Sequence, residues 1–359
     1  MTNEIPDIEV RQEVKRINNA DESINDVICL IGGFETDENY LTPVFYERLE
    51  DAEEDLYDGS ESTLPDANKA LRKIFDDDSI SGVLAVNVSV KTGTSPNETW
   101  ARSVTKTKLE NALAAVDPLV FNLLFVAEEL SDELITVIDT TGKSRLRDKK
   151  PFGFIGVGSR ANATAYGVTA SKLGDFCYAF LTQELAIRGG SLSLIESGAW
   201  LTNFIARLPV ANSLTAKTLE EVTGLGTEYT FKDGDLGATL VGLGYFVVRL
   251  INPLENTFEC VNSAGANGLD LYINRSRDYV VNDFALREYL GEHNNAGSAD
   301  GVKMECNRLL KKFRDLGAVT NIKYAVQKVN SKTLKVVLNS IEFDDIITKI
   351  EVYMTIKVG

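Results

Sequence analysis

Strict alternation of apolar and polar residues at the end of the chain most constrains what it can fold into. Between residues 350 and 358 every even position is apolar, namely Ile350, Val352, Met354, Ile356 and Val358. The odd positions carry Glu, Tyr, Thr and Lys. A period of two places one apolar face on an extended strand. The sequence therefore predicts a half-buried β-strand at residues 346–359, which needs a sheet to pair with.

The first residues repeat this pattern on a smaller scale. Ile8, Val10 and Val14 alternate with polar and charged residues just after Pro6, which predicts an extended arm at residues 1–20. Burying five apolar side chains of a terminal strand contributes on the order of 10 kcal/mol. Ordering about ten residues opposes folding by a similar amount. Each arm is therefore expected to settle only on a sheet, which either a neighbouring copy or its own subunit supplies.

The rest of the chain mixes strand and helix patterns. An amphipathic helix at residues 302–316, stopped by Gly317, leads into two strand-like segments, and residues 91–99 form the clearest linker. Further helices are predicted at residues 64–75, 105–115, 173–188 and 198–206. Strands are predicted at residues 27–31, 83–90, 120–126, 134–138 and 152–157. This mixture predicts an α/β layer architecture.

Negative charge is concentrated near the start of the chain. Residues 1–80 carry 22 acidic and 7 basic side chains, a balance of −15 within a total of −16. Nucleic-acid binding needs clustered lysine and arginine, so this distribution argues against that function. It permits a basic protein partner, and the alternative is a solvated acidic face that favours solubility.

The sequence has few histidines and cysteines, and none of them stands at the spacing of a catalytic or metal-binding motif. His293 is the only histidine and stands in a polar loop, and the four cysteines lie in apolar contexts typical of buried, reduced thiols. Gly156-Val-Gly158 imitates a dinucleotide loop, but Ala161 replaces its third glycine. No apolar run reaches 18 residues. We therefore predict no enzyme, no catalytic residue, no cofactor, no metal and no membrane insertion.

The order of segments along the chain resembles that of contractile tail sheath proteins of bacteriophages and phage-tail-like particles. The Val-Ile-Cys-Leu-Ile-Gly-Gly run at residues 27–33 is similar to the family's first buried strand and glycine turn, and residues 306–319 are similar to a helix and turn of its C-terminal domain. The other similar segments are residues 6–10, 64–75, 82–88, 204–215, 219–223, 240–250, 270–275 and 275–283. Residues 240–250 and 270–275 look like the family's strand pair. The chain lacks the glycine-rich opening common in the family.

The resemblance implies a mixed α/β (α+β) fold in which an inserted α/β domain interrupts a discontinuous core with extended terminal β arms. The expected parts are an N-terminal arm (1–20), the core (21–95 and 255–345), the inserted domain (96–254) and a C-terminal arm (346–359). Contacts between copies are expected from the apolar residues of the arms, namely Ile8, Val10, Val14, Ile350, Val352, Met354, Ile356 and Val358.

The resemblance also implies a structural function. Copies would stack as hexameric rings around a tail tube and shorten to drive the tube through a cell envelope. The implied partners are other copies, the tube protein, and the baseplate and tail terminator proteins, in a virion tail assembled in the host cytoplasm. A tail tube or capsid subunit, and a soluble α/β enzyme, remain as alternatives.

Overall fold

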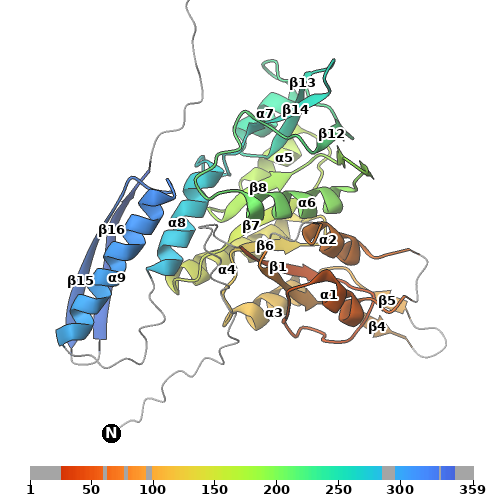
Figure 1. Cartoon of the computed structure of the whole chain (residues 1–359). Coiled ribbons are helices and arrows are strands. Elements are labelled where there is room, and N and C mark those ends of the chain that lie inside the picture. Colours follow the sequence, from red (N-terminus) through yellow and green to blue (C-terminus); the bar gives the residue numbers. More distant parts are fainter. Residues whose placement is uncertain are drawn as a thin grey trace, which may run out of the picture.

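A computed structural model describes residues 26–59, 63–76, 80–93, 99–284, 296–330 and 333–343 (Figure 1). Its centre is a six-stranded sheet in the order β2-β3-β1-β6-β7-β8. All neighbouring pairs in this sheet are parallel except β2 with β3, which are antiparallel. The strands are β1 (Val27–Gly32), β2 (Val44–Tyr46), β3 (Gly82–Asn87), β6 (Leu123–Val126), β7 (Gly153–Val157) and β8 (Cys177–Leu181). The predicted α/β class is confirmed.

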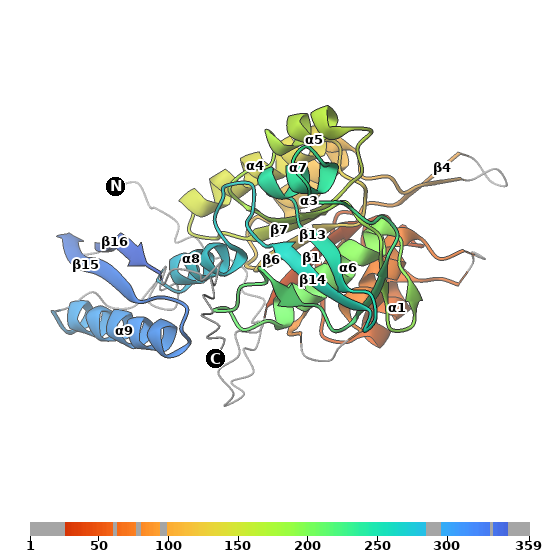
Figure 2. The ribbon, with the colours of Figure 1, turned by 90° about the horizontal axis from the view of Figure 1, so that it is seen from above.

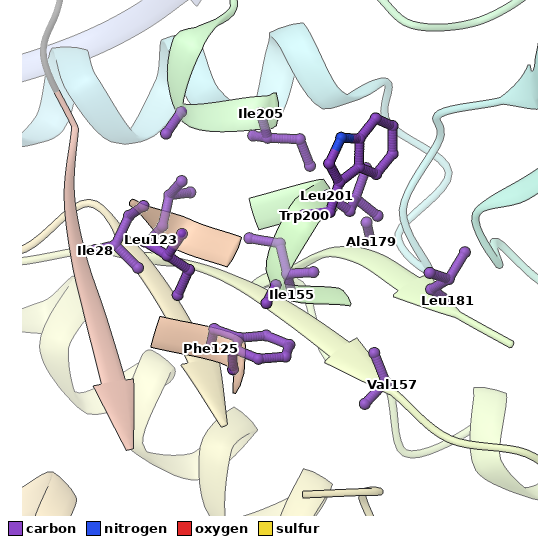
Figure 3. Close-up of a cluster of buried hydrophobic side chains, with 14 of the residues drawn as sticks. Ile28, Leu123, Phe125, Ile155, Val157, Ala179, Leu181, Trp200, Leu201 and Ile205 are labelled. Carbon is purple, nitrogen blue, oxygen red and sulfur yellow. The ribbon is translucent and has the colours of Figure 1, made fainter. Parts of the chain in front are cut away.

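Helices cover both faces of this sheet (Figure 2). Because a parallel strand is buried on both faces, it reads as a continuous apolar run, as in Val-Ile-Cys-Leu-Ile of β1. Ile28 and Leu30 enter one core cluster, and Cys29 and Ile31 enter the other. Figure 3 shows Trp200, Leu201 and Ile205 of one covering helix beside strand residues of the first cluster.

Several helices begin at a residue whose side chain caps the first turn. Ser193 and Glu196 form a capping box at the start of α6 (Leu194–Arg207), and the Ser131 side chain caps α4 (Asp132–Arg147). Residues of α1, α2 and α6 enter the first cluster, and residues of α3 and α4 enter the second. The remaining helices of this part are α1 (Leu49–Leu56), α2 (Asp66–Ile74), α3 (Lys106–Val116), α5 (Ala163–Ala170) and α7 (Leu236–Gly242).

Small antiparallel sheets accompany the central one. Their orders are β10-β9-β12, β11-β14-β13 and β4-β5. The strands are β4 (Val90–Thr92), β5 (Thr99–Ala101), β9 (Leu185–Ile187), β10 (Gly190–Ser191), β11 (Lys217–Thr218), β12 (Val222–Leu225), β13 (Val247–Asn252) and β14 (Thr257–Asn262).

The C-terminal part has a core of its own. Helix α9 (Ala296–Asp315) packs on a hairpin of β15 (Asn321–Asn330) and β16 (Thr333–Glu342), and α8 (Leu271–Asp283) contributes to the same cluster. Figure 1 shows α8 between the central sheet and this unit. The helix and the two strands were predicted, and Gly317 adopts the positive φ of +67° that suits a glycine after a helix end.

Three local predictions are wrong. Residues 134–138 lie inside α4, because the cap at Ser131 and two acidic residues behind it start a helix despite the β-branched run. Residues 173–188 form β8 and β9, since a strand buried on both faces lacks the alternation that distinguishes it from a helix. Residues 270–275 begin α8, with Asp270 as its cap, and are not a strand.

Two further segments refine the predicted organisation. The residues predicted as a linker at 91–99 belong in part to the β4-β5 hairpin. The central sheet takes strands from both sides of residue 96, the predicted start of an inserted domain. The division into a discontinuous core and an inserted domain stays a prediction.

Arg145 on α4 holds this helix against the end of α3. Its side chain is 1% exposed and donates hydrogen bonds to the carbonyl oxygens of Val116, Asp117, Leu119 and Lys150 at 2.8–3.1 Å. Its guanidinium lies 4.4 Å from the centre of the Phe121 ring and 5.8 Å from that of Phe152. One cation therefore satisfies the carbonyl oxygens at the end of α3, which no helical N–H reaches.

We expect Arg145→Met to lower the free energy of unfolding by on the order of 3 kcal/mol, because buried carbonyl oxygens lose their donors. Urea denaturation followed by circular dichroism measures this change. Arg147→Met, on the same helix with a side chain 77% exposed, is the matched control and should change stability by less than about 0.5 kcal/mol. Equal effects of the two substitutions would contradict this role of Arg145.

Candidate assembly surfaces

The described residues were compared first with the chemistry of a metal site. They contain no cluster of histidine, cysteine and acidic side chains that could hold a metal ion. All four cysteines are buried and free, as predicted, and burial raises the pKa of the Cys29 thiol to about 12. No helix among these residues has the length and apolar character to cross a membrane. His293 lies outside the described residues.

The β15-β16 hairpin is an open sheet. The two strands pair in antiparallel register from Asn321 opposite Glu342 to Asn330 opposite Thr333, with register shifts after Lys323 and after Lys328. Side chains of both strands, with Val326 and Val336 at one paired position, pack against the α9 cluster. Within the described ranges no further strand joins this sheet, so both outer edges keep main-chain groups for an added strand.

Both ends of the described chain rest on α8. At the N-terminal end, Asp26 forms an ion pair with Arg275 at 3.1 Å, and both side chains are almost completely buried. At the C-terminal end, the Phe343 ring packs edge-on against Tyr272 with a centroid separation of 6.4 Å. Residues three apart on a helix share a face, so the two residues of α8 that hold the ends of the described chain lie about one turn apart on one side of the helix.

The start of α8 is fixed by a carboxylate with several donors. Asp270 Oδ2 accepts hydrogen bonds from the hydroxyl groups of Ser213, Thr215 and Ser263 at 2.8–2.9 Å, and Oδ1 accepts the backbone N–H of Tyr272 at 3.0 Å. Charge-assisted hydrogen bonds of this kind are stronger than neutral ones. The helix start is thereby tied to segments that lie about 55 residues earlier in the chain.

The middle and end of α8 bind the neighbouring units. Tyr178 on β8 donates its hydroxyl to Asp278 Oδ2 at 2.7 Å, and Arg277 donates to Oδ1 at 2.7 Å. Asp283 at the end of the helix pairs with Lys312 of α9 at 3.1 Å. Helix α8 thus contacts the central sheet, the C-terminal unit and both ends of the described chain, through polar contacts and one aromatic contact.

The residues predicted to make contacts between copies lie outside the described residues. Ile8, Val10 and Val14 precede residue 26, and Ile350, Val352, Met354, Ile356 and Val358 follow residue 343. Their contacts stay a prediction. The sequence interpretation missed α8 as the common anchor, although Asp270 before an apolar pair is a usable helix-start signal.

The Asp26 carboxyl has an altered pKa. Burial raises it from 3.8 to about 7, against the Arg275 guanidinium and its hydrogen bond, which lower it. A raised pKa means that the folded chain binds the proton more tightly than the unfolded chain. Stability from this group is therefore full below pH 4 and is lost as the pH rises through 7.

We expect wild-type protein to lose stability relative to Asp26→Asn as the pH rises from 4 to 7, because asparagine imitates the protonated carboxyl and does not titrate. Urea denaturation of both proteins at several pH values measures the difference. Above pH 7 the difference should become constant. A gain of the wild type over the variant across this range would contradict the raised pKa and indicate a carboxylate held ionised by Arg275.

The chain was compared with known proteins by sequence and by structure, and only the structures gave matches. No protein-family model and no curated protein sequence matches the chain. The sheath tail protein of Desulfitobacterium hafniense superposes with a TM-score of 0.60 and 15% identity, over 88% of this chain and 96% of that one. The sheath tail protein of Listeria innocua gives 0.60 and 12%, over 89% and 96%.

Two particle structures contain similar chains. A chain of the anti-feeding prophage baseplate gives a TM-score of 0.65, and one of its helical sheath in the contracted state gives 0.62. Both are 13% identical and cover 93% of each chain. Identities this low establish the fold, which agrees with the predicted resemblance. The chain has the fold of contractile tail sheath proteins.

Proposed function

We propose that this chain is the structural subunit of a contractile tail sheath and not an enzyme. Copies polymerise as stacked hexameric rings around a tail tube, and the stack shortens to drive the tube through a cell envelope. The observation that carries this proposal is the match along nearly the full length of sheath proteins, one of them in a contracted sheath.

The partners follow from this function. The subunit binds other copies of itself, the tube protein along its length, and baseplate and terminator proteins at the two ends of the tail. It works in the tail of a virion or tail-like particle after assembly in the host cytoplasm. It binds no nucleic acid and does not insert into a membrane.

The proposed link between copies is strand addition. Residues 1–20 and 346–359 of one copy pair with the β15-β16 hairpins of its neighbours, where main-chain hydrogen bonds hold the copies together while their bodies reorient. Support comes from the two unoccupied hairpin edges within the described residues and from the anchoring of both chain ends on α8.

In this arrangement the alternating side chains supply the specificity. The apolar face of residues 350–358 lies against the acceptor sheet, and the polar face points away from it. Ile8, Val10 and Val14 play the same part in the N-terminal segment. A strand with one apolar face pairs with a half-covered sheet only in registers that keep this face on the sheet, since a shift by one residue exposes it.

We expect deletion of residues 346–359 to leave a folded monomer that does not form sheaths. The deletion removes the strand that a neighbour would bind but no described element. Size-exclusion chromatography and circular dichroism check the monomer, and negative-stain electron microscopy checks assembly. Full-length sheaths from the truncated chain would contradict the proposed exchange.

A point-variant pair separates the apolar face from strand length. Val352→Ser/Ile356→Ser removes two side chains of that face, each contributing about 1.5–3 kcal/mol when buried, and should raise the concentration needed for assembly at least about 100-fold. Glu351→Ser/Thr355→Ser changes the opposite face and should assemble like the wild type. Equal behaviour of the two variants would count against an apolar docking face.

The same images decide among particle types. Striated cylinders that can shorten are expected of a sheath, smooth narrow tubes of a tube protein, and closed shells of a capsid protein. A discrete monomer or dimer stabilised by a small ligand would favour an enzyme.

A further inference from the structure

The loop that leads into α8 carries the only Asn-Gly pair of the sequence, Asn267-Gly268. Asparagine is among the thermolabile residues of proteins. Glycine has no side chain, so its backbone nitrogen can approach the carboxamide of an asparagine that precedes it. The pair is therefore a candidate for a chemical modification that needs no enzyme.

The modification is deamidation, in which the two residues react with each other. The backbone nitrogen of Gly268 loses its proton and attacks Cγ of Asn267, so that a new N–C bond closes a cyclic succinimide. The bond from Cγ to Nδ2 breaks, and Nδ2 takes up the proton and leaves as ammonia. Water from the solvent then opens the ring at either carbonyl group, which leaves an aspartate or an isoaspartate at position 267.

The folded loop holds both reacting groups in hydrogen bonds. The N–H of Gly268 donates to the carbonyl oxygen of Gly265 at 2.9 Å. Nδ2 of Asn267 donates to Asn274 Oδ1 at 2.9 Å, and Oδ1 of Asn267 accepts the N–H of Leu269 at 3.0 Å. The reaction needs the proton of Gly268 removed and Nδ2 released, so the hydrogen bonds of both groups have to break first.

Close packing holds the loop in this conformation. A Cβ atom on Gly265 would lie 2.5 Å from the carbonyl oxygen of Cys177 at the start of β8, and one on Gly244 would lie 2.7 Å from that of Gly265. Gly268 has a φ of +73°, which a residue with a side chain rarely adopts. The loop therefore frees the reacting pair only by leaving its place beside β8.

The product of deamidation does not fit this loop. An aspartate at position 267 carries an oxygen in place of Nδ2, facing Asn274 Oδ1 and the carbonyl oxygen of Asp175, which Nδ2 approaches at 2.9 and 3.4 Å. Two acceptors then oppose an anionic oxygen where a donor stood. Rotating the buried Asn274 carboxamide does not remove this conflict, because its oxygen would then face the carbonyl oxygen of Leu269, to which Nδ2 of Asn274 donates at 3.1 Å.

We propose that Asn267 is a deamidation site that the folded chain protects, and that its product weakens the anchorage of α8. The site becomes reactive when the loop before α8 opens, and the modified loop closes less well. Because α8 holds both ends of the described chain, the modification acts at the helix on which the chain ends rest. The proposal concerns a single chain and does not depend on the sheath function.

Mass spectrometry of the full-length chain tests the protection. Native protein and protein unfolded in urea are incubated in the same buffer, digested, and analysed for aspartate and isoaspartate at position 267. The expected rate is at least about tenfold higher in urea, because local opening limits the reaction in the folded chain. In urea, Gly268→Ala should react more slowly than the wild type, since the added side chain hinders the attack. Equal rates in folded and unfolded protein, or no reaction at Asn267 in urea, would overturn the proposal.

A pair of substitutions tests the effect of the product. Asn267→Asp imitates the deamidated chain and should lower the midpoint of urea unfolding by about 0.5 M, because the hydrogen bonds of Nδ2 are lost. Asn162→Asp is the matched control: Asn162 caps α5 by accepting the N–H of Ala165 at 3.0 Å, and aspartate caps a helix equally well. The control should keep the midpoint of the wild type. Equal midpoints of the two variants would overturn the proposed weakening of α8.

Discussion

The arrangement of this chain depends on the buried ion pair of Asp26 with Arg275 and on α8, the helix that carries Arg275. Asp26 and Arg275 join the start of the first strand to α8 at 3.1 Å in an environment without solvent. Burying two charges is unfavourable unless they pair closely, so neither residue tolerates a change in the position of the other. Because α8 also binds β8, α9 and Phe343, its placement determines where the chain ends leave the body.

The central sheet is covered by other elements, whereas two hairpins leave strand edges unpaired among the described residues. The central sheet is covered on both faces by helices, and its strands are nearly all buried. The β15-β16 and β4-β5 hairpins, in contrast, end in edges without a further strand among the described residues. Soluble monomers usually protect such edges, and subunits of assemblies use them to bind neighbours. The distribution of open edges agrees with a subunit that keeps its body rigid and assembles through its periphery.

The sequence predicted those helices and strands whose signals lie within a few neighbouring residues. The apolar run at residues 27–31 and the amphipathic helix before Gly317 were both identified, because burial and helix ends leave signals within a few residues. The strand assigned to residues 134–138 failed, since its β-branched residues outweighed the cap at Ser131. The anchor between Asp26 and Arg275 was not predictable, because 249 residues separate its members and no short-range pattern pairs them. The arm residues named from the sequence lie outside the described ranges, so their contacts stay a prediction.

The spacing of Tyr272 and Arg275 sets the distance along α8 between the two contacts that hold the ends of the described chain. If the two terminal segments connect neighbouring copies, tension that arrives through one leaves through the other after crossing about one helical turn, roughly 5 Å of backbone. Because Asp26 immediately precedes β1, load on the N-terminal segment would also reach the six-stranded sheet through the backbone. Short connections of this kind would let neighbouring copies change their relative orientation while the folded part of each copy keeps its internal packing.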